Sequence, residues 1–359
     1  MRIQAAVLSA PQAPVTVETV ELDEPGPGEV LVRYRASGVC HSDLHVVDGA
    51  WPRPMPVVAG HEGAGVVEAV GPGVTHVKPG DHTVLTWLYP CGTCALCIRG
   101  RSWLCQGTTA GKHVLADGTT RVRRLDGSPL FQYLAIGTLA EAAVVPAAAC
   151  VPVPKELPFD VAALIGCGVA TGVGAVVNTA RVTPGTKVCV VGCGGVGLSA
   201  VMGAALASAD PIIAVDLSPG SLALATEVGA THTVLAQPGW EDQVSGVEYG
   251  FDCIGSPAVV RSLARTLLPG GAVVLVGMTA QGVQIEADGY RFPDSGLSLI
   301  GSAYGSCVAA VDFPRIARLH LAGRLPLEKL VTRRIGLDQV NEALEAMRRR
   351  EGGRSVVVF

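Results

Sequence analysis

The chain has 359 residues, of which 49% are hydrophobic and 16% are charged, and its formal net charge is -4. That length is sufficient for two domains with separate cores, and the composition is that of an ordinary globular protein. A weakly acidic chain without a broad basic face is not expected to bind nucleic acid, and the three arginines at 348–350 are expected to end a solvated helix.

The eleven cysteines are expected to lie in the reducing cytoplasm, because the first residues lack the cationic start and apolar core of a secretion signal. Cysteines in that compartment bind metals more often than they form disulfides. Two uncharged windows, 161–180 and 188–209, raise the question of a membrane span. Their glycine and alanine content favours core segments, so no membrane contact is expected.

The first part of the chain has the pattern of a β domain. Residues 30–36 alternate between apolar and polar, 63–70 and 82–87 continue the pattern, and Pro/Gly clusters separate them. We expect a barrel-like arrangement.

From about Pro184 short apolar strands alternate with helices, which indicates a parallel sheet covered on both faces. The predicted strands are 187–191, 212–216, 251–254 and 272–276, and the predicted helices are 198–207, 222–228 and 259–267. Helices at 313–321 and 339–350 and a strand at 355–359 complete the chain. The domain with the parallel sheet is therefore predicted as an insertion, with boundaries 1–168, 169–302 and 303–359.

A glycine-rich turn follows the strand that ends at Val191. The residues Gly192, Gly194 and Gly197 give G-x-G-x-x-G between a strand and a helix, with Gly195 and Val196 inside it. In that context the glycines permit a tight turn, and the helix N-terminus receives a pyrophosphate. We predict a dinucleotide-binding site.

Asp216 ends the next predicted strand, 19 residues beyond Gly197. A carboxylate there binds the ribose hydroxyls of NAD and repels the 2'-phosphate of NADP, so NAD is the predicted cofactor. The alternative is that Asp216 only caps the following helix.

Four cysteines occur in one short segment with the spacing C-x2-C-x2-C-x7-C. They are Cys91, Cys94, Cys97 and Cys105. Such a set forms a closed tetrahedral zinc site, so we predict a structural zinc that holds this loop. The alternative, a pair of disulfides, is disfavoured by spacing and compartment.

A second set is spread along the chain: Cys40, His61 and Cys167. Each alone is an ordinary buried cysteine or core histidine. Together, two thiolates and one imidazole leave the fourth zinc position open, as in a catalytic site where zinc lowers the pKa of a bound hydroxyl.

Six segments then carry a family resemblance: GVCHSD, GHEGAG, the four-cysteine loop, GCGVATG, VGCGGVG and IIAVD. They resemble the zinc-dependent medium-chain dehydrogenase/reductase family, specifically its alcohol dehydrogenases, over essentially the whole chain. The resemblance implies an α/β fold in which a GroES-like β-barrel catalytic domain is joined to a Rossmann doubly wound parallel-sheet domain. It also implies hydride transfer between an alcohol or aldehyde and NAD, with two Zn2+ per subunit.

The resemblance assigns roles to further residues. Asp43 and Glu62 would support the catalytic zinc ligands, and Ser42 and His45 would form a proton relay, although a helix-capping serine and a surface histidine are the plain alternatives. The other cofactor contacts implied are His41, Thr171, Val196 and Arg354. The substrate pocket would be lined by Trp51, Trp87, Leu139 and Met278, which favours small or flat alcohols. The family also implies a homodimer paired through residues 297–301.

The chain also departs from its relatives. Its segment 107–133 is long, as in class III enzymes that oxidise thiol adducts of formaldehyde, yet Thr109 stands where they have a glutathione-binding arginine. Other stretches resemble an actinobacterial branch that includes mycothiol-dependent formaldehyde dehydrogenases. Arg121, Arg123 and Arg124 would then meet an anionic thiol, or else form a solvated basic loop. Ser221 stands at a position beside the adenosine pocket where relatives often have a lysine.

Three functions remain open at this point. The leading one is an NAD-dependent zinc alcohol dehydrogenase, the second is a thiol-dependent formaldehyde dehydrogenase of the mycothiol type, and the third is a scaffold that binds NAD and zinc without catalysis.

Overall fold

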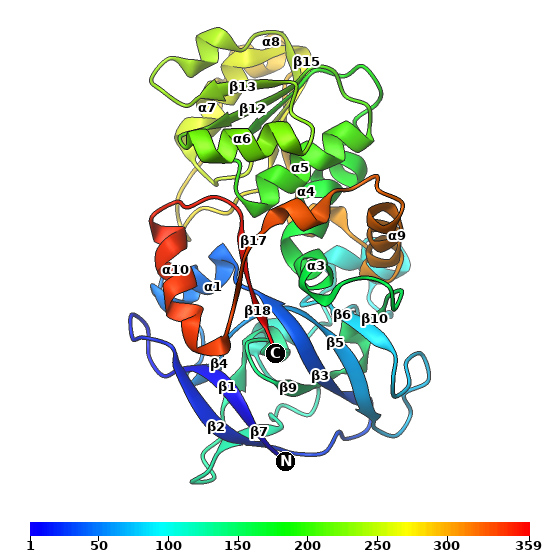
Figure 1. The fold of residues 1–359 in the computed structure, drawn as a ribbon. Helices are drawn as coiled ribbons and strands as arrows, with labels where there is room; N and C mark the ends of the chain where they lie inside the picture. Colours follow the sequence, from blue (N-terminus) through cyan, green and yellow to red (C-terminus); the bar gives the residue numbers. More distant parts are fainter.

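Two β-sheets form the lower lobe of the structure, a computed structural model that describes residues 1–359 (Figure 1). One sheet has five strands in the order β7-β2-β1-β4-β8. The other has seven: six in the order β10-β6-β5-β3-β18-β17, with β9 also paired to β3. Their bounds are β1 (Arg2–Leu8), β2 (Thr16–Leu22), β3 (Glu29–Gly38), β4 (Val57–Val58), β5 (Glu62–Val70), β6 (His82–Leu85), β7 (Val122–Arg124), β8 (Phe131–Gln132), β9 (Ala142–Pro146), β10 (Cys150–Pro152), β17 (Val331–Ile335) and β18 (Arg354–Val358).

The end of the chain returns to this lobe. β18 pairs antiparallel with β3, with Val356 opposite Gly38, and β17 pairs parallel with β18. The last strand therefore lies beside a strand from the first forty residues, as an inserted nucleotide domain requires. The boundaries 1–168, 169–302 and 303–359 are kept as our proposal.

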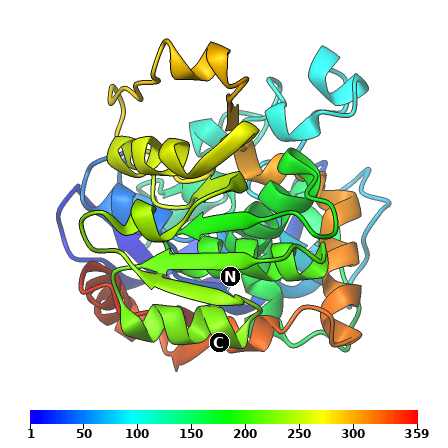
Figure 2. The same cartoon turned by 90° about the horizontal axis from the view of Figure 1, so that it is seen from above.

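The upper lobe is a six-stranded parallel sheet in the order β13-β12-β11-β14-β15-β16, flanked by helices (Figure 2). This is the predicted doubly wound parallel sheet, and the predicted fold class is confirmed. The strands are β11 (Val188–Val191), β12 (Ile212–Asp216), β13 (His232–Leu235), β14 (Val247–Asp252), β15 (Leu267–Leu275) and β16 (Ser298–Gly301). The helices of the chain are α1 (His41–Val47), α2 (Ala95–Ile98), α3 (Phe159–Leu164), α4 (Ala170–Gly174), α5 (Gly195–Leu206), α6 (Pro219–Glu227), α7 (Pro257–Thr266), α8 (Arg291–Asp294), α9 (Ala309–Leu321) and α10 (Val340–Arg348).

Some element boundaries differ from prediction. The strand predicted at 272–276 is the second half of β15, and residue 267, predicted in a helix, begins it. The helix predicted from residue 313 begins earlier, at Ala309. The Asp312 carboxylate stabilises this start, because it accepts the backbone N–H of Val308, the residue that caps the helix, at 2.7 Å. Pro314 is tolerated close to this helix start.

The helical segment 159–180 joins the two lobes. It is long and apolar enough to cross a membrane by length and composition alone, but 83% of its apolar window is buried inside the protein. The largest hydrophobic cluster includes Val84 of β6, Leu164 of this segment and Val190 of β11. The segment is therefore part of a core shared by both lobes, which fixes the position of Cys167 within it.

Candidate active site and metal centres

The glycine turn lies between β11 and α5. Gly192 has φ +91°, a left-handed conformation that favours glycine, and a Cβ on Gly197 would lie 1.6 Å from the Gly192 carbonyl oxygen. At Gly194, which caps α5, an added Cβ would meet nothing within 4 Å, so this side of the turn is open to a ligand. The predicted strand, turn and helix are therefore present with the geometry that receives a pyrophosphate.

Asp216 stands at the end of β12, next to this turn. Its carboxylate accepts the backbone N–H of Cys193 at 2.7 Å and that of Ser218 at 2.8 Å. The cap of α6 is Ser218, whose hydroxyl accepts the N–H of Ser221 at 3.3 Å. Asp216 therefore positions the glycine turn, while the helix cap is a different residue.

Two further predicted cofactor residues lie on α4 and α5, which pack against each other. Thr171 of α4 and Val196 of α5 are both half-buried. A Cβ on Gly172 would lie 2.2 Å from the Val196 carbonyl oxygen, so the two helices approach as closely as a glycine allows. His41, at the start of α1, is exposed to solvent.

The four-cysteine loop brings its thiols into one cluster. The sulfurs of Cys91, Cys94, Cys97 and Cys105 all lie within 4.8 Å of one another. Backbone N–H groups of Thr93 and Cys94 lower the pKa of Cys91 to about 6, whereas desolvation and the Cys94 sulfur raise that of Cys97 to about 12. Four sulfurs so close together ionise fully only with a cation among them, which is the chemistry of a closed zinc site.

The second set assembles from three distant segments. Cys40 follows β3 and caps α1, His61 precedes β5, and Cys167 lies in a π-helical turn, Ile165–Val169, of the shared helical segment. One ligand atom from each, with one from Glu62, lies within 4.8 Å of the others. Local irregularity of this kind is common where a helix must place a functional side chain.

His61 is oriented as a metal ligand. Its Nδ1 lies 3.0 Å from Asp43 Oδ1, and both residues are buried. Because a carboxylate only accepts, Nδ1 donates, and the Nε2 lone pair is left free. Nε2 is buried and has no hydrogen-bond partner in the protein. A metal ion between Nε2 and the two sulfurs would satisfy it, so the residues present fit zinc.

The two thiols of this set behave as a pair. A hydrogen bond from Cys167 is the main reason that the pKa of Cys40 is well below its usual value, and the pKa of Cys167 is correspondingly raised. Burial opposes a charge on His61, but the Asp43 carboxylate outweighs this and raises its pKa. A cation in the site replaces the protons that these ligands share.

Both carboxylate oxygens of Glu62 are already hydrogen-bonded within the protein. Its Oε1 accepts the N–H of Gly168 at 3.0 Å, and its Oε2 accepts a hydrogen bond from Arg354, which also donates to the Val39 carbonyl at 3.1 Å. A Cβ on Gly195 would lie 2.5 Å from the Arg354 side chain. Arg354 therefore lies between the catalytic ligands and the glycine turn. With Glu62 engaged, three ligands and an open fourth position remain.

The predicted relay and pocket residues lie in different environments. Ser42 and His45 are on α1 and both are half-buried, and burial followed by the charge of His41 lowers the pKa of His45. The ring of Trp51 lies 4.6 Å from that of His45. The remaining predicted pocket residues are the half-buried Trp87, the fully buried Leu139 and the exposed Met278. Their roles stay predictions.

Two tyrosines near the site were missed from the sequence. Tyr133 meets the His61 ring edge-on, with ring centroids 5.4 Å apart. Tyr304 packs on Trp87 at 4.5 Å and donates from its hydroxyl to the carbonyl of Gly166, next to Cys167. No spacing pattern marks either residue, since each reaches the site only through tertiary packing.

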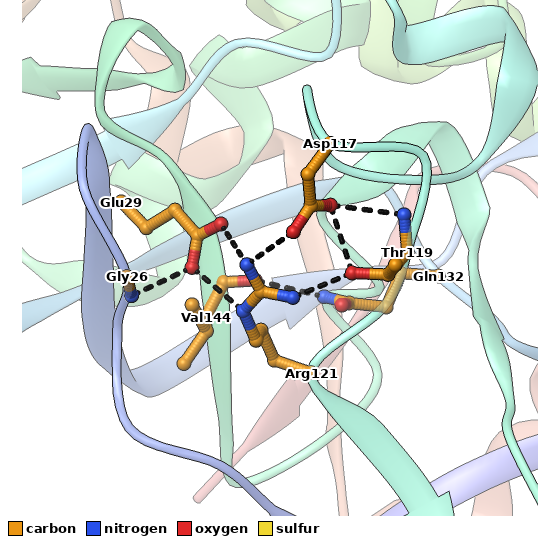
Figure 3. Close-up of polar contacts among 7 residues, drawn as sticks. All are labelled: Gly26, Glu29, Asp117, Thr119, Arg121, Gln132 and Val144. Carbon is orange, nitrogen blue, oxygen red and sulfur yellow. Dashed lines mark hydrogen bonds and ion pairs between the residues drawn. The ribbon is translucent and has the colours of Figure 1, made fainter.

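All three arginines that the sequence singled out are paired with carboxylates in the folded protein. Arg121 donates to Glu29 at 2.7 Å and to Asp117 at 2.7 Å (Figure 3). Arg123 pairs with Glu21 and Asp23, and Arg124 pairs with Glu18. The three guanidinium groups, on and beside β7, tie this edge strand to neighbouring segments and are already neutralised. Thr109 likewise bonds to Tyr89, with 2.8 Å between the hydroxyl oxygens.

Comparison with known proteins finds relatives that match the whole chain in sequence and in structure. The model of the alcohol dehydrogenase GroES-like domain matches residues 26–155, and that of zinc-binding dehydrogenases matches residues 195–320. S-(hydroxymethyl)glutathione dehydrogenase of Paracoccus denitrificans is 37% identical, with both chains covered in full. A crystal structure of an alcohol dehydrogenase zinc-binding domain protein from Burkholderia ambifaria has a TM-score of 0.96 and 38% identity, with 100% of this chain and 99% of that one covered. Benzyl alcohol dehydrogenase of Acinetobacter calcoaceticus has a TM-score of 0.94 and 30% identity over the same shares.

These matches extend over the whole chain and agree with the two sets of metal ligands and the glycine turn. The cofactors are zinc, which the two cysteine-containing sets fit, and a nicotinamide dinucleotide. The chain belongs to the zinc-dependent alcohol dehydrogenases of the medium-chain dehydrogenase/reductase family.

Proposed function

We propose that the protein interconverts small or flat alcohols and their aldehydes or ketones, with NAD as the hydride acceptor. The observation that carries this proposal is the buried, unpartnered Nε2 of His61 beside Cys40 and Cys167. Arg354 connects this set to the glycine turn. When bound, the zinc ion supplies Lewis acidity toward a hydroxyl group, and the nicotinamide supplies a hydride acceptor.

The protein's own residues then handle orientation and the proton. Asp43 fixes the His61 ring, and Arg354 and Gly168 hold the Glu62 carboxylate. In the proposed relay the proton of the alcohol would pass to Ser42 Oγ, through the ribose of a bound cofactor, to His45 and then to solvent; burial lowers the pKa of His45 and so favours its neutral, proton-accepting form. Thr171 and Val196 present one face of the nicotinamide to the substrate.

The test is a panel of primary and secondary alcohols, run on zinc-loaded protein with NAD and with NADP. We expect reduction of NAD with at least one small or aromatic alcohol. Zinc-loaded protein that reduces neither cofactor across the panel would contradict the proposal and would favour the non-catalytic scaffold.

Preference for NAD is expected to depend on Asp216. Exchanging Asp216 for asparagine removes the charge that repels a 2'-phosphate while retaining an acceptor for the Cys193 N–H. We expect the ratio of kcat/KM for NAD to that for NADP to fall by about tenfold or more. Asp242→Asn, at an exposed position of the same lobe, is the charge-matched control. An unchanged ratio in the Asp216 variant would show that another group selects the cofactor.

A thiol-dependent activity is the second candidate, because a relative is named for S-(hydroxymethyl)glutathione. Thr109 is bonded to Tyr89, and the three arginines beside β7 are paired with carboxylates, so none of these four residues offers a free cation to a thiol carboxylate. Formaldehyde oxidation measured with and without glutathione distinguishes thiol-dependent activity from the alcohol oxidation proposed first. A rate that rises only with the thiol would reverse our order of preference.

We further propose a homodimer in the reducing cytoplasm, a compartment in which zinc-binding thiols stay reduced. The pairing element is β16, one of the two edge strands of the parallel sheet, whose exposed backbone groups are open to a second copy. Sedimentation at micromolar concentration should give the dimer mass, and a monomer would rule out this assembly.

A further inference from the structure

Arg53 is a half-buried arginine without a counter-charge. Only two half-buried arginines in the chain, Arg53 and Arg291, have no carboxylate within 4.0 Å. Arg291 donates to two backbone carbonyls, of Arg265 and Leu267. Arg53 donates only to the neighbouring Pro52 carbonyl at 3.0 Å, and its Nε is buried with no partner. Partial burial of a cation without a partner is unfavourable, so an anion from outside the chain would stabilise it.

The position of Arg53 relates this cation to the catalytic centre. Three residues further on, the Pro56 carbonyl accepts the N–H of Phe131 at 2.9 Å, and β4 runs parallel to β8. Tyr133 follows β8 directly and lies edge-on against His61. The strand pairing therefore connects the segment that begins at Arg53 to Tyr133, which contacts a predicted zinc ligand.

His113, whose pKa responds to the charge of Arg53, is neutral. His113 is fully buried and stacks on Tyr133, with ring centroids 5.5 Å apart and planes at 8°. Its Nδ1 accepts the N–H of Leu134 at 2.9 Å, so that nitrogen carries no proton. Burial, followed by the charge of Arg53, lowers the pKa of His113 to about 4. The imidazole is therefore uncharged near pH 7, and neither of its protonation states could supply a counter-charge for Arg53.

We propose that Arg53 is a specificity residue that binds a carboxylate carried by the substrate, at the end remote from the reacting hydroxyl. The inference rests on the proposed alcohol oxidation and narrows its substrate class to alcohols that bear a carboxylate. Tyr133, with Trp51 and Trp87, favours an aromatic ring between the two groups. The guanidinium group recognises a carboxylate through paired hydrogen bonds. In the reaction the carbinol carbon gives its hydride to NAD and the hydroxyl loses its proton, while the carboxylate is unchanged.

The experiment compares benzyl alcohol with 3- and 4-(hydroxymethyl)benzoate on the holoenzyme with NAD. We expect kcat/KM to be about ten- to a hundredfold higher for at least one benzoate than for benzyl alcohol. Arg53→Gln should lower this ratio to near one, and Arg53→Lys should leave it in between. Arg261→Gln, which removes an exposed arginine from α7, is the charge-matched control and should leave the ratio unchanged.

Salt provides a measurement that requires no variant. The KM for the benzoate should rise with ionic strength while that for benzyl alcohol stays constant. If Arg53→Gln does not fold, the preference and salt response of the natural protein decide the matter. A natural protein that oxidises benzyl alcohol but shows no carboxylate preference, or a ratio that Arg53→Gln leaves intact, overturns the inference alone.

Two other outcomes have distinct meanings. If benzyl alcohol and both benzoates are inert together with the whole alcohol panel, the proposed function itself has failed. If formaldehyde with glutathione, which also supplies carboxylates, is the preferred substrate and Arg53→Gln removes that preference, Arg53 binds the carboxylate of a thiol adduct. That result would support the role of Arg53 and identify the source of the anion.

Discussion

Cys40→Ser is expected to abolish alcohol oxidation, with kcat/KM reduced by about a thousandfold or more. The sulfur is one of three ligands, and its loss leaves His61 Nε2 and Cys167 unable to retain the ion. The fold should tolerate the change, because position 40 caps α1 and serine is a favoured capping residue. Activity with NAD, zinc per subunit and thermal unfolding together check this prediction.

The matched control is Cys150→Ser, which changes a buried cysteine of β10 that belongs to neither metal set. Zinc should fall from two ions to one per subunit in the Cys40 variant and stay at two in the control. A Cys40 variant that kept two ions and normal turnover would disprove the assigned role. An equal loss of activity in the control would point to general damage.

The second large effect is expected at the four-cysteine loop. No residue from Cys91 to Leu104 is buried, so this segment has almost no hydrophobic core and depends on its metal. Cys105→Ala should lose one zinc ion and loosen the chain around the exposed Arg99 and Arg101, so that trypsin cleaves there faster by about tenfold or more. Limited proteolysis with mass spectrometry of the fragments measures this.

Chelation of the natural protein should produce the same two cuts, and restored zinc should suppress them. Cys253→Ala, which changes a cysteine of the other lobe, is the control and should leave the loop protected. Equal resistance at Arg99 and Arg101 with and without metal would show that packing, rather than zinc, holds the loop.

The two metal sets differ in how far the sequence determines them. The four-cysteine loop spans fifteen residues, so local spacing alone brings its sulfurs together. The catalytic set spans Cys40 to Cys167, and its members meet only because β3, β5 and the shared helical segment pack together. Its prediction therefore depended on the family resemblance, and the structure supplied the Asp43 contact that orients His61.

The partners of the arginines near β7 could not be predicted from the sequence, because these ion pairs join distant segments of the chain. The basic residues near β7 form a conspicuous charge cluster, yet their partners, such as Glu18 and Glu29, lie about a hundred positions away. Arg53, by contrast, has no distinctive sequence context, and only its half-buried and unpaired state in the folded chain sets it apart.

The sequence by itself determined the fold class, the glycine turn and the structural zinc loop, because strand periodicity, glycine placement and short cysteine spacing act over a few residues. Tertiary structure alone decided which polar atoms are satisfied. It left His61 Nε2 and Arg53 Nε buried without partners and engaged Glu62 with Arg354. These outcomes depend on contacts between segments up to 292 positions apart, which no local pattern encodes.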